Sequence, residues 1–269
     1  MTVSGAVAIL GGGKIGEALL SGLLRGERTA DDVVVCEKHP ERAAYLSAQH
    51  GVRAVDVAGA AAAAGTLVIA VKPQDIDVLL AELHEVITPE HVVVSVAAGI
   101  PTAHIEQALP AGVAVVRCMP NTPALVDEAM TAVAAGVHAD EAHLAVAESL
   151  LGAVGKVVRV PESQLDAVTA LSGSGPAYFF FLVEAMIHAG ILLGLPRALA
   201  ADLIVQTAIG SAVMLRDSGE HPVQLREAVT SPGGTTIAAI RELEVHGVRA
   251  ALLAAIEAAC RRSAELGAG

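Results

Sequence analysis

From residue 7 to residue 160 the chain alternates short apolar runs with segments of helical pattern, and this alternation most constrains its fold. The runs are rich in β-branched residues and apolar at every position, which is typical of a parallel sheet covered by helices. After Pro161 only long helical segments follow, broken by glycine and proline. We therefore predict an α/β domain over 1–161 and an all-α domain over 162–269. The expected strands are 7–10, 33–36, 66–71, 91–97, 113–119, 130–136 and 156–160.

Several of the intervening helices have recognisable ends. Asp56 is expected to cap a helix that stops before Gly65, and Thr102 is expected to cap a helix that stops before Pro110. The last helix, over 248–266, carries apolar residues along one face.

The first strand leads into the glycine-rich stretch "GGGKIG", which contains Gly11, Gly13 and Gly16 in the pattern G-x-G-x-x-G. Between a strand and a helix, this pattern indicates a dinucleotide-binding domain of the Rossmann type. Gly11 permits the tight turn, Gly13 lets the backbone approach a pyrophosphate, and Gly16 lets helix and strand pack closely. The N–H groups and the dipole at the helix N-terminus then favour the phosphates.

The residue expected to contact the adenosine ribose lies about 20 positions beyond the last glycine, which here is Glu37. A carboxylate suits a ribose diol and therefore NAD. Lys38, His39 and Arg42 follow at once and suit a 2′-phosphate, hence NADP. These residues alone leave both cofactors open.

Small residues also follow three later strands, in "AVKPQD" (70–75), "SVAAGIP" (95–101) and "RCMPNTPA" (117–124). The carboxyl edge of an open α/β sheet is where such folds bind ligands. A rigid polar loop around Asn121 would suit the nicotinamide or its ribose, and an ordinary strand-to-helix turn explains it equally well.

The helical half contains two loops that lead into helices, "LSGSGP" (171–176) and "SPGGTT" (231–236). In the first, we expect serine and glycine at the helix cap and Pro176 in the first turn. The second forms a nest of N–H groups that suits a carboxylate or phosphate. Because the glycine loop at 11–16 already serves the dinucleotide, the second anion site is expected to bind a substrate.

Composition narrows the choice of partners. With 17 basic and 29 acidic residues the formal net charge is −12, which argues against nucleic acid or an anionic membrane as partner. The three cysteines are far apart and show no metal-ligand spacing, so no metal is expected. We interpret the apolar segment 177–195 as a buried helix at a subunit interface rather than a membrane span. Glu184 and His188 lie one turn apart within it, and we interpret them as a satisfied buried pair rather than a catalytic pair. We expect a soluble, cytoplasmic homodimer.

The chain resembles the pyrroline-5-carboxylate reductases, the enzymes of the last step of L-proline biosynthesis. The likeness includes the glycine loop, "VKP" (71–73), "AAG" (97–99) and "RCMPNTP" (117–123). It continues through "DAVTALSGSGPAY" (166–178), "GLPR" (194–197), "SPGGTT" and "EAACRRSAEL" (257–266), so it covers nearly the whole chain in the family's order.

The resemblance implies NAD(P)H-dependent reduction of pyrroline-5-carboxylate, and roles for particular residues. Thr236 would hydrogen-bond the ring nitrogen at the catalytic centre. NADPH is the cofactor the family favours, and NADH is expected to work as well, because Glu37 and Lys38 stand where many members carry Asn-Arg. The resemblance also implies dimers, often gathered into a decamer. The implied substrate-binding residues are Ser231, Pro232, Gly233, Gly234, Thr235 and Thr236. The implied cofactor-binding residues are Gly11, Gly13, Lys14, Ile15, Gly16, Glu37, Lys38, Val71, Lys72, Pro73, Ala97, Ala98, Met119 and Asn121.

Two alternatives belong to other classes. A 3-hydroxyacid-type dehydrogenase shares the two-domain plan, but it would normally carry a lysine on the long helix, and 176–215 contains none. A non-enzymatic dinucleotide sensor would have no reason to keep the anion nest at 231–236. No Tyr-x-x-x-Lys pattern or catalytic dyad is evident, which suits hydride transfer to an imine controlled by orientation.

Overall fold

The computed structural model describes residues 5–267 and divides the chain into two compact units. Unit 1 comprises Met1–Ser174 together with Ala259–Gly269, and unit 2 comprises Gly175–Ala258. Residues 162–174, which the sequence analysis assigned to the second domain, therefore pack within unit 1. The last helix begins in unit 2 and ends in unit 1, where Ser263 Oγ donates a hydrogen bond to Asp166 at 2.6 Å.

Unit 1 is built on an eight-stranded sheet of order β3-β2-β1-β4-β5-β6-β7-β8. All neighbouring strands are parallel except β6 and β7, which are antiparallel, so the expectation of an all-parallel sheet was wrong at that point. Between β6 and β7 lies only the short connection η3, whereas a parallel return needs a crossover of about a dozen residues. The strands are β1 (Val7–Leu10), β2 (Val33–Cys36), β3 (Arg53–Ala54), β4 (Thr66–Ile69), β5 (Val92–Ser95), β6 (Ala114–Met119), β7 (Ala129–Ala135) and β8 (Gly155–Arg159).

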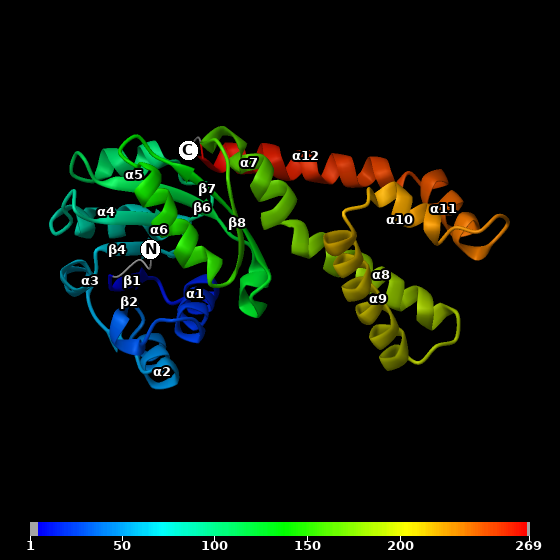
Figure 1. The fold of residues 1–269 in the computed structure, drawn as a ribbon, viewed down its shortest axis with the longest axis horizontal. Helices are drawn as coiled ribbons and strands as arrows, with labels where there is room; N and C mark the ends of the chain where they lie inside the picture. Colours follow the sequence, from blue (N-terminus) through cyan, green and yellow to red (C-terminus); the bar gives the residue numbers. More distant parts are fainter. Residues whose placement is uncertain (1–4, 268–269) are drawn as a thin grey trace. The chain divides into compact units, whose positions relative to one another are not determined.

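Helices cover both faces of the sheet (Figure 1). The helices α1, α2 and α6 pack on one face, around buried residues such as Ile9 and Leu20. The helices α3, α4 and α5 pack on the other, around Leu10 and Leu80. This confirms the doubly covered Rossmann-type arrangement. The helices of unit 1 are α1 (Lys14–Arg25), α2 (Pro40–His50), α3 (Val57–Ala63), α4 (Ile76–His84), α5 (Thr102–Ala108), α6 (Glu141–Gly152) and α7 (Leu165–Val168), with short turns η1 (Ala30–Asp32), η2 (Pro73–Asp75), η3 (Thr122–Val126), η4 (Glu162–Gln164) and the π-helical η5 (Thr169–Gly173).

The two predicted helix caps had different outcomes. Asp56 caps α3 as expected, since its Oδ1 accepts a hydrogen bond from the Gly59 N–H at 2.7 Å. Thr102 does not cap α5: it is the first helical residue, and Pro101 occupies the cap position. The Thr102 hydroxyl donates to the Glu162 carboxylate at 2.6 Å instead. A bond to a charged acceptor is stronger than a cap on a helix N–H, which explains the difference.

Glu162 joins three elements of unit 1. Besides the Thr102 hydroxyl, it accepts hydrogen bonds from the Thr102 N–H at 2.8 Å and from Arg117 Nη1 at 3.1 Å. Burial raises the pKa of Glu162, but the hydrogen bonds from Thr102 and Arg117 outweigh it and hold that pKa below its usual range. Arg117, in β6, is only 8% exposed, and Glu162 is the carboxylate with which this buried side chain forms an ion pair.

Unit 2 is entirely helical, as predicted. Helices α8 and α9 pack against each other, and a side chain on Gly190 would lie 2.9 Å from the Ala200 Cβ, so their backbones approach closely. Within the stretch 171–176, where serine and glycine were expected at a helix cap, the chain is already π-helical up to Gly173, and α8 begins at Gly175 after Ser174. The helices are α8 (Gly175–Leu192), α9 (Arg197–Ser218), α10 (Pro222–Ala228), α11 (Thr235–Val245) and α12 (Val248–Gly267).

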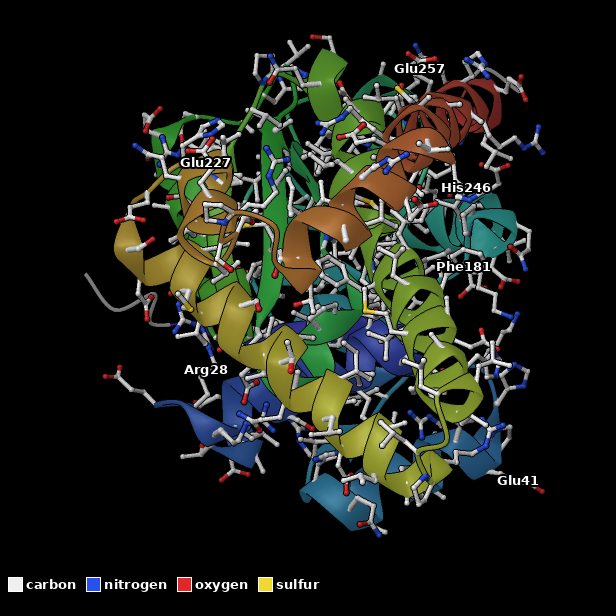
Figure 2. All side chains as sticks on the ribbon, turned by 90° about the vertical axis from the view of Figure 1, so that its right-hand side faces the viewer. Arg28, Glu41, Phe181, Glu227, His246 and Glu257 are labelled. Carbon is white, nitrogen blue, oxygen red and sulfur yellow. The ribbon has the colours of Figure 1, made fainter. Side chains whose placement is uncertain are left out.

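The helices of unit 2 expose many apolar side chains in the single chain. Phe181 on α8 is 70% exposed (Figure 2). Glu184 and His188, predicted as a buried pair, are both exposed here, and the described residues show no hydrogen bond or ion pair between them. Two helical stretches, Glu162–Leu192 and Arg197–Ser218, are long and apolar enough to cross a membrane by length and composition alone. One or two such helices are weak support for a membrane span, since core helices of soluble proteins pass the same test.

The replacement Glu162→Gln is expected to lower stability in a pH-dependent way. The lowered pKa means that ionised Glu162 stabilises the fold at pH values above about 4.3, the usual value of a glutamate, and this contribution disappears as pH falls through the folded-state pKa. At pH 7 we expect a loss of about 1–3 kcal/mol in the free energy of unfolding. Urea unfolding of wild type and variant between pH 3 and pH 7 measures this difference (roughly the window in which a carboxyl group titrates).

Glu90→Gln is the matched control, because Glu90 is exposed and the described residues show no hydrogen bond to its side chain. It is expected to leave stability unchanged at every pH. A deficit in Glu162→Gln that stays constant down to the acid end would contradict the role of the Glu162 charge.

Candidate functional site

The backbone between β1 and α1 makes two close approaches that leave no room for side chains. A Cβ on Gly11, whose φ is +109°, would lie 2.7 Å from the Ala70 carbonyl oxygen. A Cβ on Gly16 would collide with the Gly11 carbonyl oxygen. The chain therefore turns sharply after β1, and α1 starts at Lys14 with its N-terminus at the carboxyl edge of the sheet.

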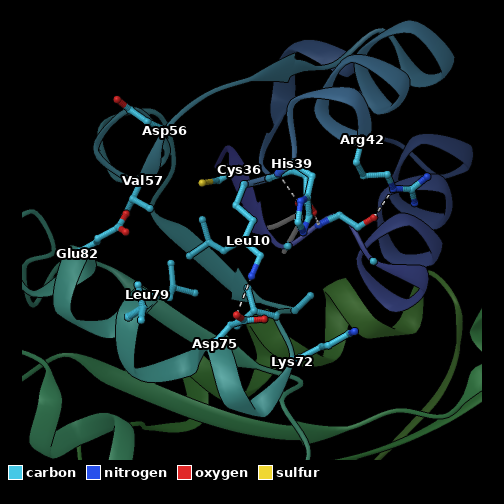
Figure 3. A pocket seen from close by; sticks show the side chains of 18 of the residues that line it. Leu10, Cys36, His39, Arg42, Asp56, Val57, Lys72, Asp75, Leu79 and Glu82 are labelled. Carbon is cyan, nitrogen blue, oxygen red and sulfur yellow. Dashed lines mark hydrogen bonds and ion pairs between the residues drawn. The ribbon is translucent and has the colours of Figure 1, made fainter.

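Gly13 differs from these two glycines. It is the N-cap residue of α1, no side chain caps this helix, and nothing lies within 4 Å of the position that a Cβ on Gly13 would take. Gly13 also lines a cavity of about 1000 Å³ at the carboxyl ends of β1, β2 and β4 (Figure 3). The first turn of α1 thus presents backbone beside open space.

The cavity has a polar end and an apolar end. The glycine loop and the charged residues that follow β2 form the polar end, together with Lys72 after β4. Apolar side chains from the start of α3 and from α4, with Val57 and Leu79 among them, line the other end, where the carboxylates of Asp56 and Glu82 lie beside them (Figure 3). Such a shape suits a ligand with one charged and one flat apolar portion.

The charged side chains of the cavity are tied to one another and to the backbone. Glu37 accepts hydrogen bonds from the Gly12 N–H at 2.8 Å and from the His39 N–H at 2.9 Å. Lys38 pairs with Asp75 at 2.7 Å. Arg42 Nε donates to the Gly12 carbonyl at 2.7 Å (Figure 3). Its Nη2 pairs with Glu17 at 2.5 Å. Hydrogen bonds from Arg42 and His50 lower the pKa of Glu17 against the opposing effect of burial.

Cys36, at the end of β2, also lines the cavity. Burial raises the pKa of its thiol to about 11, and the nearby Glu82, Asp56 and Glu37 add to the effect. A thiol with so high a pKa is protonated at neutral pH, so Cys36 contributes apolar surface and no nucleophile. Within residues 5–267, no group of three or more histidine, cysteine, aspartate or glutamate side chains is arranged to hold a metal ion.

The cofactor residues predicted from the resemblance fall into three groups. Gly11, Gly13, Glu37, Lys38, Val71 and Lys72 line the cavity. Lys14, Ile15 and Gly16 form the first turn of α1, and Pro73 begins η2 directly after Lys72. Ala97, Ala98, Met119 and Asn121 lie at or just beyond the carboxyl ends of β5 and β6, outside the cavity lining.

Asn121 has a structural function in unit 1. Its Nδ2 donates to the Ser172 carbonyl and to Ser172 Oγ, both at 3.2 Å, and its Oδ1 accepts from the Met130 N–H at 3.0 Å. The side-chain amide thus ties the loop after β6 to η5 and to β7. The sequence left open whether this loop contacts the nicotinamide or is an ordinary strand-to-helix turn. These contacts favour a structural function for the Asn121 side chain.

The predicted substrate loop lies in unit 2, where "SPGGTT" turns into α11. Gly233 has φ +69°, a left-handed conformation that suits glycine, and the Gly234 N–H donates to the Ser231 carbonyl at 3.1 Å. Gly234 is the N-cap residue of α11, and no side chain caps this helix. A helix N-terminus preceded by such a turn offers N–H donors to an anion.

Part of the cavity lining was not predicted from the sequence. The principal omissions are Gly12, whose backbone contacts both Glu37 and Arg42, and Asp75, the partner of Lys38. The apolar lining from Val57 and Leu79 was not predicted either. The helical spacing of Asp75 and Leu79 after "VKP" was the available sequence signal, and spacing does not show which face of α4 lines the cavity.

Comparison with known proteins gives a consistent result over both units. A family model described as pyrroline-5-carboxylate reductase dimerisation matches residues 162–266, and one described as NADP oxidoreductase coenzyme F420-dependent matches residues 6–99. The chain is 48% identical to a pyrroline-5-carboxylate reductase of Mycobacterium tuberculosis, over 97% of this chain and 96% of that protein. It is 44% identical to one of Corynebacterium melassecola, over 97% and 98% of the two chains.

Solved structures agree with these relatives. The pyrroline-5-carboxylate reductase of Coxiella burnetii superposes with a TM-score of 0.92 at 36% identity, covering 98% of each chain. The pyrroline carboxylate reductase of Plasmodium falciparum, solved with NADP bound, gives 0.89 at 25% identity, again over 98% of each chain. With close relatives aligned over almost its entire length, the chain belongs to the pyrroline-5-carboxylate reductase family.

Proposed function

We propose that this protein reduces L-1-pyrroline-5-carboxylate to L-proline with a reduced nicotinamide dinucleotide. The observation that carries the proposal is 48% identity to a pyrroline-5-carboxylate reductase over 97% of the chain, so both the dinucleotide domain and the helical domain are aligned. The cavity beside the glycine loop and the turn before α11 supply the two anion-binding surfaces that the reaction needs.

The cavity of unit 1 fits a dinucleotide. The uncapped first turn of α1 and the open space beside Gly13 suit a pyrophosphate, because the N–H groups and helix dipole there favour negative charge. The apolar end around Val57 and Leu79 suits the adenine ring. Ala97, Ala98 and the chain around Met119 follow the next strands of the same sheet edge, the expected position of the nicotinamide.

The chain's own residues bind and orient the substrate. The loop Ser231–Thr236 would hold the carboxylate through backbone N–H groups and hydroxyls, and Thr236 would hydrogen-bond the ring nitrogen. The reduced nicotinamide supplies the hydride that converts the C=N carbon of the imine to CH. Because a protonated imine is already electrophilic, the protein contributes mainly proximity and orientation, and no nucleophile is required.

Each of the two rival functions disagrees with one feature of the chain. A 3-hydroxyacid-type dehydrogenase needs a proton donor beside the carbonyl, and α8 and α9 carry no lysine up to residue 215. A non-enzymatic dinucleotide sensor does not require the turn at Gly233–Gly234 or an uncapped α11.

The proposal also covers the oligomeric state of the protein and its cellular compartment. The dimerisation family model covers the apolar helices of unit 2, whose Phe179, Phe180 and Phe181 are each at least 64% exposed in the single chain. We propose that a second copy of the chain covers them, with the homodimer as minimal unit and a decamer as a further assembly. A cytoplasmic enzyme that binds neither nucleic acid nor membrane would suit a chain with a net charge of −12.

The direct test is an assay of the purified protein with pyrroline-5-carboxylate, followed by the loss of NADH or NADPH absorbance. Formation of proline with at least one of the two cofactors is the expected result. No turnover with either cofactor, from a protein that binds dinucleotide, would exclude the proposed reaction.

Gly13→Ala is expected to impair dinucleotide binding without destabilising the fold. The added methyl group meets no protein atom within 4 Å, and φ at Gly13 is −68°, an ordinary value for alanine. It would occupy the space proposed for the pyrophosphate, so the dissociation constant should rise at least about ten-fold. Fluorescence titration with the dinucleotide measures the dissociation constant, and thermal unfolding measures the stability of the fold.

Gly65→Ala serves as its control, since Gly65 also has nothing within 4 Å and lies outside the cavity lining. It should change neither quantity. Unimpaired dinucleotide binding by Gly13→Ala would show that the phosphates bind elsewhere.

Thr236→Ala is expected to lower kcat/KM for pyrroline-5-carboxylate by about ten-fold or more, as the loss of one hydrogen bond at the reacting ring implies. The dissociation constant for the dinucleotide should stay within about two-fold, which is below half a kcal/mol. Thr236→Ser, which keeps the hydroxyl, should retain most of the activity. A parallel loss of dinucleotide affinity in Thr236→Ala would mean that the loop at 231–236 serves the cofactor.

A further inference from the structure

The polar end of the cavity is organised around one fixed carboxylate. Each oxygen of Glu37 accepts one backbone hydrogen bond, from Gly12 and from His39. The Gly12 N–H belongs to the glycine loop itself, so Glu37 is held against the backbone that faces the cavity. A carboxylate has about four acceptor positions, so each oxygen keeps capacity for a further donor. A ribose diol offers two such donors.

The cations nearest to Glu37 already have anionic partners. Lys38 pairs with Asp75, and Arg42 pairs with Glu17 while it also donates to the Gly12 carbonyl. The guanidinium of Arg42 lies 4.9 Å from the centre of the Tyr45 ring, which further fixes its position. Part of the charge of each cation is therefore already offset by a carboxylate before a ligand binds.

The cavity as a whole carries no excess of positive charge. Its lining contains four carboxylates, from Glu37, Asp56, Asp75 and Glu82, against three cations, from Lys38, Arg42 and Lys72, although Asp56 and Glu82 lie at the end lined by Val57 and Leu79 (Figure 3). Lys72 has no hydrogen bond or ion pair among the described residues, but it follows β4 rather than β2. A 2′-phosphate carries about −1.5 to −2 charges at pH 7. In its fully ionised form it has no O–H group that could donate a hydrogen bond to Glu37. Close to a carboxylate, like charges cost binding free energy.

We propose that this chain binds NADH in preference to NADPH, and that Glu37 is the residue that sets the preference. The carboxylate of Glu37 accepts hydrogen bonds from the ribose diol and repels a 2′-phosphate, while Arg42 is a positioning residue that braces the Gly12 carbonyl and α1. The inference deepens the proposed function by naming the dinucleotide. It contrasts with the expectation of NADPH from family resemblance, and with the NADP found in the Plasmodium falciparum structure.

Equilibrium titration of the purified full-length protein with NADH and with NADPH tests the proposal without the imine substrate. The chain contains no tryptophan, so the nicotinamide fluorescence of the ligand can be followed against a low protein background. We expect the dissociation constant for NADH to be lower than that for NADPH by about ten-fold or more. An equal or lower constant for NADPH would overturn the proposal.

Glu37→Gln tests the residue. Glutamine keeps the shape of the side chain and an acceptor for the Gly12 N–H, but it removes the charge that opposes a phosphate. The preference for NADH should fall by about ten-fold, mainly through tighter binding of NADPH. An equal loss of affinity for both dinucleotides would show that Glu37 only supports the glycine loop, and would overturn its role in specificity.

Glu41→Gln is the matched control for total charge. Glu41 lies four residues further along, on α2, is exposed and extends away from the ribbon into solvent (Figure 2), and does not line the cavity. It should leave the ratio of dissociation constants unchanged. Equal shifts from both variants would assign the preference to net charge and contradict the role of Glu37. Failure of the proposed reaction is a separate outcome. It would appear as absent turnover of pyrroline-5-carboxylate while the ratio of the dissociation constants for NADH and NADPH stays as expected.

Discussion

The close approach of backbone to backbone around Gly11 and Gly16 is the constraint on which the cofactor half depends. The Gly11 carbonyl occupies the space of any side chain at Gly16, and Ala70 in turn excludes a side chain at Gly11. Because β1, the turn and α1 are packed this tightly, the N-terminus of α1 reaches the carboxyl edge of the sheet. The cavity exists because that edge is left open between β1, β2 and β4.

Both proposed anion sites use backbone donors at uncapped helix N-termini, α1 in unit 1 and α11 in unit 2. This choice has a physical reason in a chain with 29 acidic and 17 basic residues. The long-range field of such a protein repels anions, so binding depends on donors within hydrogen-bonding distance. Clustered lysines would be drawn to neighbouring carboxylates, as Lys38 is drawn to Asp75. Peptide N–H groups carry no net charge and keep their direction.

The sequence predicted the class of the fold because the burial of strands and helices determines where apolar residues occur along the chain. Strands such as β4 and β5, buried at every position, appear as uninterrupted apolar runs. The strand β3 was missed because its two residues, Arg53 and Ala54, are exposed and carry no such pattern. The antiparallel direction of β7 depends on the length of the connection before it, which an apolar run does not reveal. Thr102 failed as a cap because its partner, Glu162, lies 60 residues away.

The candidate site illustrates a further limit of prediction from sequence. The sequence shows which charged residues lie near a ligand, but it does not show which partners they bind. Around the end of β2, Glu37 indicated a ribose diol while Lys38 and Arg42 indicated a phosphate, and no local rule ranks them. The proposed preference for NADH rests on the contacts, because both cations are bound to other carboxylates whereas the bonds of Glu37 among the described residues come from N–H donors. A cation with a carboxylate partner has part of its charge already offset, and a carboxylate on backbone donors keeps its charge and its free acceptor positions. In this proposal, selectivity follows from which charges are already paired, and long-range partners such as Glu17 and Asp75 contribute to it.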